Sequence, residues 1–321
     1  MDKRKTAIIT GITGQDGAFL SELLLDKGYH VMGIVRSLNS FNKKGLEYLG
    51  ILDKVEIVEC SLLDFTQISN LLKSTKPSEI YNLAAQSSVS VSFKQPIDTF
   101  HFNTISVINL LEAIKLIDPS IKFYQASSSE MFGDINQLPI LEDSIFHPKS
   151  PYAISKASAH WLCVNYRESY GLFISCGILF NHESYLRSDS FFIKKVLSSA
   201  RLISEGKMEN LTVGNIDIKR DFGYAPKYVE AMYKMLQHHE ARNFLVCSGQ
   251  SVSLRDIIYY VFDRYNLSHE LVVVDEKLIR PAEIPDIYGS PENTKSMLHW
   301  DYDFTINDLL DKLIEEEEQN K

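Results

Sequence analysis

The chain has 321 residues, 45% of them hydrophobic, and a formal net charge of -9 at pH 7. This length allows a large core in one large or two closely packed domains, and the acidic balance argues against a protein whose main partner is nucleic acid. No apolar run approaches the ~20 residues that cross a bilayer, and the opening MDKRKTAIIT leads directly into a predicted strand. We therefore expect a cytoplasmic protein that binds neither nucleic acid nor a membrane.

Apolar, β-rich runs alternate with amphipathic helical stretches in the first half of the chain. The predicted strands are 6–10, 30–36, 55–60, 79–85, 121–127 and 172–180. The predicted helices between them are 17–27, 64–74, 97–117 and 150–169. This order predicts right-handed βαβ crossovers and therefore an α/β fold with a doubly wound parallel sheet of the Rossmann type.

After about residue 181 the alternation loosens. Short strands are predicted at 209–214, 243–247 and 270–275, and helices near 225–239, 253–265 and 305–317. We expect residues 1–180 to form the Rossmann domain, with segments of about 216–247 returning to it, and residues 181–321 to form mainly a smaller α/β lobe. The tail LIEEEEQNK is most simply the solvent-exposed end of a helix, and its four consecutive acids should fray that end because they oppose the helix dipole.

The four cysteines are scattered, with no CxxC pair and no spacing typical of a disulfide framework. They are Cys60, Cys163, Cys176 and Cys247. His238 and His239 are adjacent, so on a helix they would point apart, and no HExxH motif occurs. We predict core thiols and no bound metal.

TGITGQDG follows the first strand and opens the first helix, with Gly11, Gly14 and Gly17 in a GxxGxxG spacing. Such a turn lets the backbone approach a pyrophosphate, and the N-terminus of the helix then presents unpaired N–H groups to that anion. Three glycines alone could be ordinary turn residues. The strand before them and the helix after them favour dinucleotide binding.

The end of the second strand favours NADP over NAD. An acid at that position would bind the ribose 2′-hydroxyl of NAD, whereas an arginine accommodates the 2′-phosphate of NADP. No carboxylate occurs between Asp26 and Glu47, and Arg36 ends the strand with Lys43 and Lys44 beyond it. We predict NADP as cofactor; the alternative for Arg36 is an ordinary solvent-exposed side chain.

SPYAISKASAHW places Tyr152 and Lys156 four residues apart on a predicted helix, and hence on one face of it. A lysine ammonium beside a tyrosine is expected to lower the pKa of the phenol, which makes it a usable base for taking a proton from an alcohol. YxxxK alone occurs by chance in many helices. Its position after the fifth strand of a dinucleotide-binding fold favours a catalytic role.

FYQASSSEMFG runs off the fifth strand and places Ser128 and Glu130 at the carboxyl edge of the sheet, where such folds bind their ligands. The serines could equally form a strand-end turn, and Glu130 could be a solvent-exposed loop acid. Because both lie beside the tyrosine–lysine pair, we predict that Ser128 hydrogen-bonds the reacting oxygen and that Glu130 moves a proton at carbon.

Over nearly its whole length the sequence resembles the extended short-chain dehydrogenase/reductase superfamily and, within it, the GDP-mannose 4,6-dehydratase family. The segments that carry the resemblance are TGITGQDG, EIYNLAAQSSVSVSF, FYQASSSEMFG, SPYAISKA, NYRESYGLF, GILFNHES, VGNIDIKRDFGYAPKYVEAM and RPAEI. The resemblance implies a redox-neutral dehydration. Tyr152, supported by Lys156, takes the C4 hydroxyl proton as hydride passes to NADP; Glu130 then removes the C5 proton as water leaves C6, and hydride returns to C6.

The resemblance also implies which residues hold the two ligands. Those implied for the cofactor are Gly11, Thr13, Gly14, Gln15, Asp16, Gly17, Arg36, Leu62, Ala84, Ala85, Tyr152 and Lys156. Those implied for a GDP-sugar are Gln86, Ser87, Asn181, Glu183, Lys195, Arg220, Arg280 and Glu283. Guanidinium groups such as Arg220 match phosphate geometry, although each of these charged residues could instead form a structural ion pair.

Several positions depart from the family pattern. Serine replaces threonine at Ser128, Ser61 replaces an aspartate close to the adenine, Tyr185 replaces proline, Phe222 replaces tryptophan, and Ser88 occupies a variable position. These departures preserve the predicted reaction type but leave another GDP-linked hexose, amino sugar or heptose open as substrate. A keto-sugar reductase or epimerase, or a protein that binds NADP without catalysis, would share the fold.

Two features bear on assembly. The helices at 97–117 and 150–169 resemble the pair that forms a four-helix dimer interface in the superfamily, although their apolar faces could simply cover the sheet. The segment RSLNSFNKKGLEYL resembles a loop that reaches a neighbouring subunit's cofactor in the dehydratase. We expect a homodimer or a homotetramer.

Overall fold

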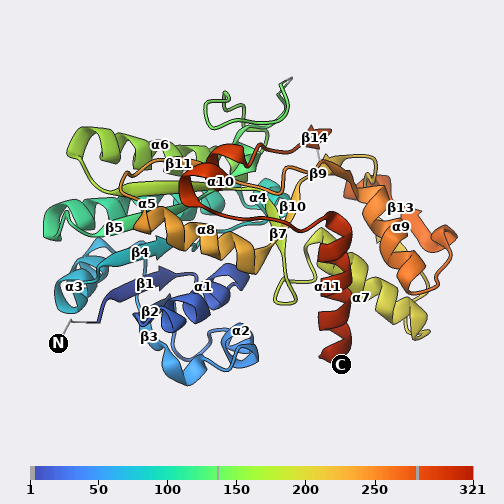
Figure 1. Cartoon of the computed structure of the whole chain (residues 1–321), viewed down its shortest axis with the longest axis horizontal. Coiled ribbons are helices and arrows are strands. Elements are labelled where there is room, and N and C mark those ends of the chain that lie inside the picture. The colour runs from blue at the N-terminus through green and yellow to red at the C-terminus, as the bar shows by residue number, and fades with distance from the viewer. Residues whose placement is uncertain (1–3, 136, 280–281, 321) are drawn as a thin grey trace.

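The computed structural model describes residues 4–135, 137–279 and 282–320. Its centre is a seven-stranded parallel sheet with the strand order β11-β6-β5-β4-β1-β2-β3 (Figure 1). The strands are β1 (Thr6–Thr10), β2 (His30–Val35), β3 (Glu56–Glu59), β4 (Glu79–Asn82), β5 (Lys122–Ser128), β6 (Ile174–Leu179) and β11 (Asn243–Val246). The predicted α/β fold with a doubly wound sheet is confirmed, and the strand order reverses between β1 and β4.

Helices cover both faces of the sheet (Figure 1). On one face lie α1 (Gln15–Asp26) and α8 (Ala225–Gln237), and on the other lie α3 (Phe65–Thr75), α5 (Pro96–Ile117) and α6 (Pro151–Tyr170). Neighbouring residues on a strand point to opposite faces, so Tyr124 packs with the first group of helices and Phe123 with the second. Each face therefore has its own buried apolar cluster.

Helix α5 is, by length and composition alone, able to cross a membrane, with 22 residues and a mean hydropathy of 1.2 over its most apolar window. In the fold it packs between α3 and α6. Leu111 and Ile114 are fully buried, whereas Ile97 is 81% exposed and Leu116 is 65% exposed. Its hydropathy thus combines a face that covers the sheet with an exposed apolar edge.

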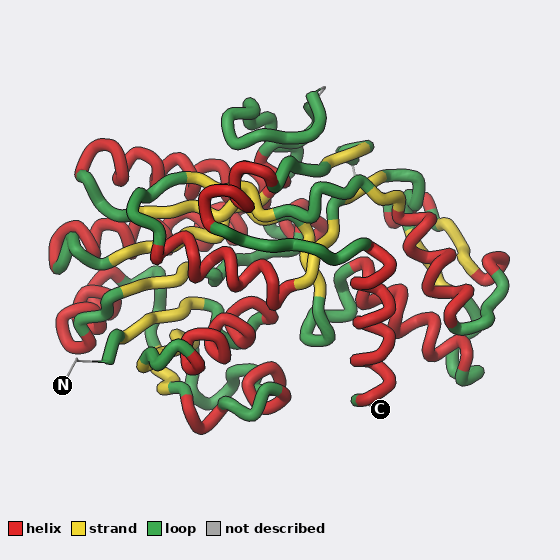
Figure 2. Tube along the Cα trace, in the orientation of Figure 1, coloured by secondary structure: helices red, strands yellow, loops and turns green. Residues whose placement is uncertain are grey.

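The second half of the chain adds a cluster of three helices at one end of the sheet (Figure 2). These are α7 (Phe192–Ser204), α9 (Leu254–Arg264) and α11 (Ile306–Gln319). The short strands beside them are β7 (Asn181–Glu183), β8 (Leu211–Val213), β9 (Lys219–Arg220), β10 (Phe222–Tyr224), β12 (Val252–Ser253), β13 (Val272–Val274) and β14 (Asp286–Ile287). The remaining α-helices among the described residues are short: α2 (Lys44–Tyr48), α4 (Val89–Lys94) and α10 (Glu292–Leu298). The predicted domain boundary at residue 180 stays a prediction.

The acidic tail differs from its prediction. Helix α11 continues through the four acids to Gln319, and Glu317 is buried. Its carboxylate pairs with Lys194 on α7, and Arg201 lies 3.8 Å from its second oxygen. The predicted frayed, solvent-exposed end is therefore wrong, because a buried ion pair holds this end of the helix against α7.

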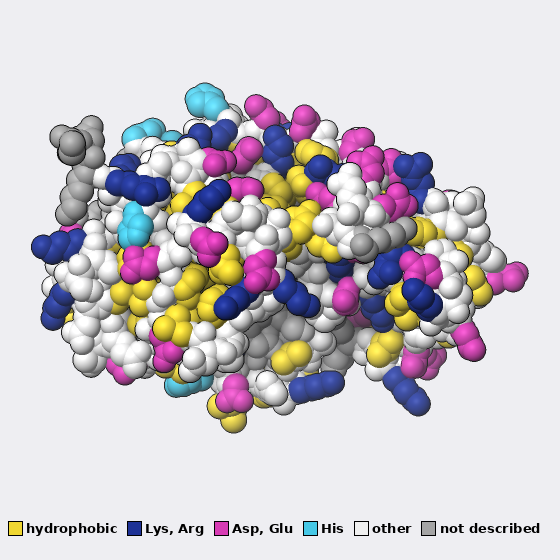
Figure 3. All heavy atoms as spheres, turned by 90° about the horizontal axis from the view of Figure 1, so that it is seen from below, with side chains coloured by type: hydrophobic (Ala, Val, Ile, Leu, Met, Phe, Trp, Pro, Cys, Tyr) yellow, Lys and Arg dark blue, Asp and Glu magenta, His cyan; other side chains and the backbone are white. Residues whose placement is uncertain are grey.

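The surface carries both signs of charge. On the face shown in Figure 3, lysine and arginine side chains are interspersed with aspartate and glutamate, and hydrophobic side chains gather between them. A protein that wraps nucleic acid would instead concentrate basic side chains on one face.

Candidate active site

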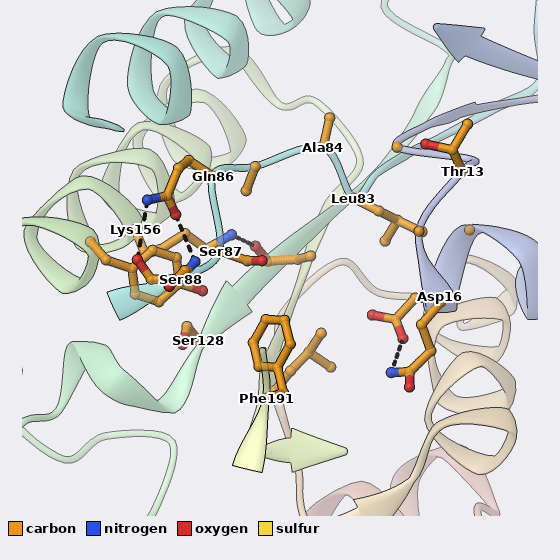
Figure 4. A pocket seen from close by; sticks show the side chains of 18 of the residues that line it. Thr13, Asp16, Leu83, Ala84, Gln86, Ser87, Ser88, Ser128, Lys156 and Phe191 are labelled. Carbon is orange, nitrogen blue, oxygen red and sulfur yellow. Dashed lines mark hydrogen bonds between the residues drawn. The ribbon is translucent and has the colours of Figure 1, made fainter. Parts of the chain in front are cut away.

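A cavity of about 1220 Å³ opens at the carboxyl edge of the central sheet, where the strand order reverses (Figure 4). Residues that directly follow β1, β2, β4 and β5 form one side of it. Residues of β7, the segment 184–191 and β10 form the other side. The cavity is thus shared between the central sheet and the second half of the chain.

The glycine turn forms a close-fitting floor at one end of the cavity. Gly11 has a φ of +73°, and a Cβ built there would lie 2.9 Å from the amide nitrogen of Ala84. A Cβ on Gly17 would lie 2.4 Å from the carbonyl oxygen of Gly11, so both positions require glycine. No described side chain caps the start of α1, whose first N–H groups follow Gly14. This cradle fits the pyrophosphate of a dinucleotide.

Asp16, in the first turn of α1, is held by His182 on β7. The Nε2 atom of His182 lies 2.9 Å from the Asp16 carboxylate, and the imidazole stacks on the ring of Tyr228. Burial alone would raise the pKa of Asp16, but attraction to His182 and their hydrogen bond lower it overall. Burial would lower the pKa of His182, but Asp16 raises it. Each residue therefore favours the charged form of the other in a partly buried acid–histidine pair.

Arg36 follows β2 and lines the cavity beside Ser37. The nearby acid Glu59, at the end of β3, accepts a hydrogen bond from the backbone N–H of Leu38 at 2.9 Å. That carboxylate is therefore engaged by the loop, and the arginine faces the cavity. All the residues predicted to bind the cofactor line this one cavity: Gly11, Thr13, Gly14, Gln15, Asp16, Gly17, Arg36, Leu62, Ala84, Ala85, Tyr152 and Lys156.

The four predicted catalytic residues also line the cavity. Ser128 ends β5, and its Oγ accepts a hydrogen bond from the backbone N–H of Glu130 at 3.3 Å. Ser150 caps the start of α6 by accepting from the N–H of Ala153. This cap places Tyr152 in the first turn of α6, and Lys156 lies one turn further on.

The electrostatics of this group differ from expectation. Burial raises the pKa of Tyr152 to about 12, although the hydrogen bond with Ser128 opposes the shift. Burial also lowers the pKa of Lys156 to about 8, and its ammonium donates to the carbonyl oxygen of Ala126 on β5. The pKa of the phenol is therefore raised in this structure, against the predicted lowering, because burial is the largest influence on it.

The residues predicted for the substrate divide into two groups. Those that line the cavity are Gln86, Ser87, Asn181, Glu183 and Arg220. Lys195 and Glu283 are not among the described lining residues: the ammonium of Lys195 donates to the carbonyl of Thr212 at 2.6 Å, and Glu283 accepts from Asn215 at 2.7 Å. Arg280 lies outside the described residues.

The side-chain amide of Gln86 is used within its own loop. It accepts from the N–H of Ser88 at 2.6 Å and donates to the carbonyl of the same residue at 3.1 Å, as Figure 4 shows. Arg220 donates to the carbonyl oxygens of Lys219 and Ile284 at 2.6 Å and 2.7 Å. Both residues therefore shape the cavity wall through backbone contacts.

Sequence reasoning missed His182, Arg187 and Phe191, which also line the cavity. The guanidinium of Arg187 lies 3.6 Å from the centre of the Phe191 ring, and its Nε lies 3.6 Å from the buried carboxylate of Glu183. Burial raises the pKa of Glu183, and Arg187 opposes that shift. The sequence gives little signal for this pair, because Glu183 ends the short strand β7 and Arg187 lies in the irregular segment that follows it.

The parallel sheet, the glycine turn before α1 and the Ser128, Tyr152 and Lys156 group at the carboxyl edge define an extended short-chain dehydrogenase/reductase. The family model described as GDP-mannose 4,6 dehydratase matches residues 8–313. The chain belongs to the GDP-mannose 4,6-dehydratase family.

Relatives in distant organisms support this membership. The GDP-mannose 4,6-dehydratase of Sinorhizobium fredii (strain HH103) is 38% identical, covering 99% of this chain and 97% of that protein. The GDP-mannose 4,6 dehydratase of Cricetulus griseus is also 38% identical, covering 97% of this chain and 91% of that protein. The GDP-mannose 4,6 dehydratase 2 of Arabidopsis thaliana is 39% identical, covering 99% of this chain and 88% of that protein.

Two solved structures share the fold. RMD from Pseudomonas aeruginosa, complexed with NADPH, is 27% identical with a TM-score of 0.81, covering 99% of both chains. DesIV, a dTDP-glucose 4,6-dehydratase from Streptomyces venezuelae with NAD and TYD bound, is 18% identical with a TM-score of 0.87, covering 98% of this chain and 97% of that one. At that identity the second likeness concerns the fold alone.

Proposed function

We propose that this chain is a GDP-mannose 4,6-dehydratase that converts GDP-mannose to GDP-4-keto-6-deoxymannose and water. The observation that carries the proposal is the meeting of Ser128, Glu130, Tyr152 and Lys156 at a single cavity that also contains the glycine turn. Membership of the family, with relatives of that name in bacteria, plants and animals, supports the same reaction.

The cofactor is a nicotinamide dinucleotide, which is supported by the glycine cradle and by neighbours solved with NAD or NADPH. Within that class we propose NADP. Arg36 lines the cavity at the end of β2, where a guanidinium suits a 2′-phosphate, and Glu59 is engaged by the backbone of Leu38. Held by the glycine turn and Arg36, a nicotinamide would supply reversible hydride transfer between C4 and C6 of the sugar.

The residues of the chain supply the proton transfers. Tyr152 takes the proton of the C4 hydroxyl as the C4–H bond breaks, and Ser128 donates a hydrogen bond to the same oxygen. We infer that the ammonium of Lys156, one helical turn from Tyr152 on α6, stabilises the phenolate that takes part in this exchange. The new C4 ketone acidifies the C5–H bond, so Glu130 removes that proton and delivers it to the C6 hydroxyl, which leaves as water. When C6 is then reduced, C5 takes up a proton again, which balances the proton that Tyr152 took from the C4 hydroxyl.

We propose that the substrate is a GDP-sugar whose nucleotide extends towards the second half of the chain. Asn181, Glu183 and Arg220 line that side of the cavity. Residues 1–180, with the returning segment of about 216–247, would then hold the cofactor, and the rest of 181–321 would bind mainly the nucleotide sugar. A nucleotide-sugar substrate as a class is supported by the relatives.

We propose that the chain forms a homodimer through α5 and α6, with a homotetramer as the larger alternative. Large apolar side chains on the outer edges of these helices are exposed: Ile97, Phe100, Leu116, Ile154 and Trp161. Burying such a surface against a second copy is favourable. Light scattering on the purified protein would decide the number of subunits. A cytoplasmic location stays a prediction.

The proposed function is tested with a panel of GDP-, CDP-, UDP- and dTDP-sugars and a catalytic amount of NADP+. We expect a 4-keto product from GDP-mannose with no net formation of NADPH. Ser88 and Phe222 depart from the family pattern and line the cavity, so the panel includes other GDP-hexoses, GDP-amino sugars and GDP-heptoses. If only one of these other sugars gave a 4-keto product, that sugar would replace GDP-mannose as the proposed substrate. Stoichiometric consumption of NADPH with a 4-keto sugar would indicate a reductase.

A further inference from the structure

Two stacked tyrosines, neither among the described residues that line the cavity, connect the segments that form its two sides. Tyr48 ends α2, which belongs to the segment after β2, and Tyr185 lies in the 184–191 segment after β7. Their rings stack with centroids 5.0 Å apart and an interplanar angle of 28°. Tyr48 is 39% exposed, and Tyr185 is half-buried. Tyr185 is also one of the departures from the family pattern.

Tyr185 is held from its other side by the second half of the chain. The Nζ atom of Lys194 on α7 lies 4.1 Å from the centre of the Tyr185 ring. The same ammonium forms a buried ion pair with Glu317 on α11, and Glu316 accepts from the backbone N–H of Tyr185 at 3.3 Å. Tyr48 therefore stacks on a ring whose position is fixed by α7 and α11.

Each stacked tyrosine belongs to a segment that lines the cavity. The segment before Tyr48 contributes Ser40, Phe41 and Asn42 beside Arg36. The 184–191 segment contributes Arg187, Ser190 and Phe191, and Figure 4 shows Phe191 among the side chains around the cavity. Arg187 and Tyr152 line the same cavity, so this segment and the catalytic group share one space.

We propose that the Tyr48–Tyr185 stack couples binding of the dinucleotide to binding of the nucleotide sugar, and that Tyr185 is a positioning residue for Arg187 and Phe191. The proposal rests on the proposed function. A dinucleotide that contacts 36–42 orders the segment carrying Tyr48, and the stack passes that order to the 184–191 segment. The second ligand then loses less conformational entropy when it binds, so the two ligands bind with positive cooperativity.

The test measures two dissociation constants by calorimetry: that of GDP with and without saturating NADPH, and that of NADPH with and without saturating GDP. Reciprocity requires the same coupling factor from both pairs. An aromatic pair changes an equilibrium constant by about two- to tenfold, so we expect Tyr185→Ala and Tyr48→Ala each to reduce the coupling factor by about that much. Tyr185→Phe keeps the ring and should retain wild-type coupling.

The control is Tyr259→Ala, which removes a ring stacked on His269 at 3.9 Å, away from the lining of the cavity. It should leave the coupling factor unchanged. Wild-type coupling in Tyr185→Ala, or equal losses of affinity for each ligand whether or not the other is present, would overturn the proposal. So would the absence of coupling in a wild-type protein that binds both ligands. A wild-type protein that bound neither NADPH nor GDP would contradict the proposed function as well.

Discussion

Lys156 on α6 donates a hydrogen bond to the carbonyl oxygen of Ala126 on β5, and this contact ties the catalytic helix to the strand that carries Ser128. Lys156 is buried, with a relative exposure of 5%. Holding this ammonium one helical turn from Tyr152 therefore requires burial of a charge, which costs free energy. The cost and the catalytic role of Lys156 can be separated by experiment.

Lys156→Met should strongly reduce turnover while leaving the fold stable. Burial lowers the pKa of Lys156 from 10.5 to about 8. Between these values the unfolded chain binds a proton that the folded protein has lost, so the contribution of Lys156 to stability rises with pH across that window. We expect denaturant unfolding to show this rise in the wild type and not in Lys156→Met, and turnover to fall by about 10²–10⁴-fold.

Lys122→Met is the matched control for that experiment. Lys122 also donates to a backbone carbonyl, that of Leu236 at 2.6 Å, and burial also lowers its pKa. It is not among the described residues that line the cavity. The Lys122→Met variant should therefore keep turnover near the wild-type rate. Loss of activity in both variants to the same degree would show that lysine-to-methionine changes disturb the fold in general.

Tyr152→Phe should lower kcat by about 10²–10⁴-fold, because the phenol oxygen that takes the C4 proton is removed. The change keeps the ring and should alter the unfolding temperature little. The measurement is formation of the 4-keto product. Tyr166→Phe, on the same helix, removes a hydroxyl that donates to Glu112 and should leave kcat unchanged. Undiminished turnover in Tyr152→Phe would remove this residue from the role of base.

Glu130→Gln should separate the two halves of the reaction. The amide cannot take the C5 proton, so we expect hydride transfer to NADP+ to survive while loss of water slows by about 10²–10⁴-fold. Reduced nicotinamide should then accumulate in a single turnover, and deuterium from solvent should no longer enter at C5. Glu142→Gln, outside the lining of the cavity, is the control. Normal yields of the 4-keto-6-deoxy product in Glu130→Gln would contradict the assignment.

The parts of the site that depend on neighbouring residues could be predicted from the sequence. The turn through Gly11, Gly14 and Gly17 needs only the flanking strand and helix, and the spacing of Tyr152 and Lys156 needs only a helix. The doubly wound parallel sheet was predicted from the alternation of strands and helices, and the observed topology agrees with it. These features are local, so their pattern is complete within a short stretch of chain.

Contacts between distant segments could not be predicted in this way. His182 pairs with Asp16 across 166 residues, and Glu317 pairs with Lys194 across 123. The acidic tail was misjudged for this reason, because its own sequence shows only repulsion. Lys195 was assigned to the substrate by resemblance, yet resemblance fixes a position in the chain and not the direction of a side chain, which here points to Thr212.

Arg36→Ala should change the choice of cofactor. The side chain is exposed at the cavity edge, and a charge-assisted hydrogen bond to a phosphate contributes about 1.5–3 kcal/mol, so the Kd for NADP+ should rise by about ten- to a hundredfold. The Kd for NAD+ should change little, because NAD+ has no 2′-phosphate. Fluorescence titration with both dinucleotides measures the ratio. Lys44→Ala removes an exposed cation outside the cavity lining and should leave the ratio unchanged. Equal losses for both dinucleotides in Arg36→Ala would show that the guanidinium does not read the 2′-phosphate.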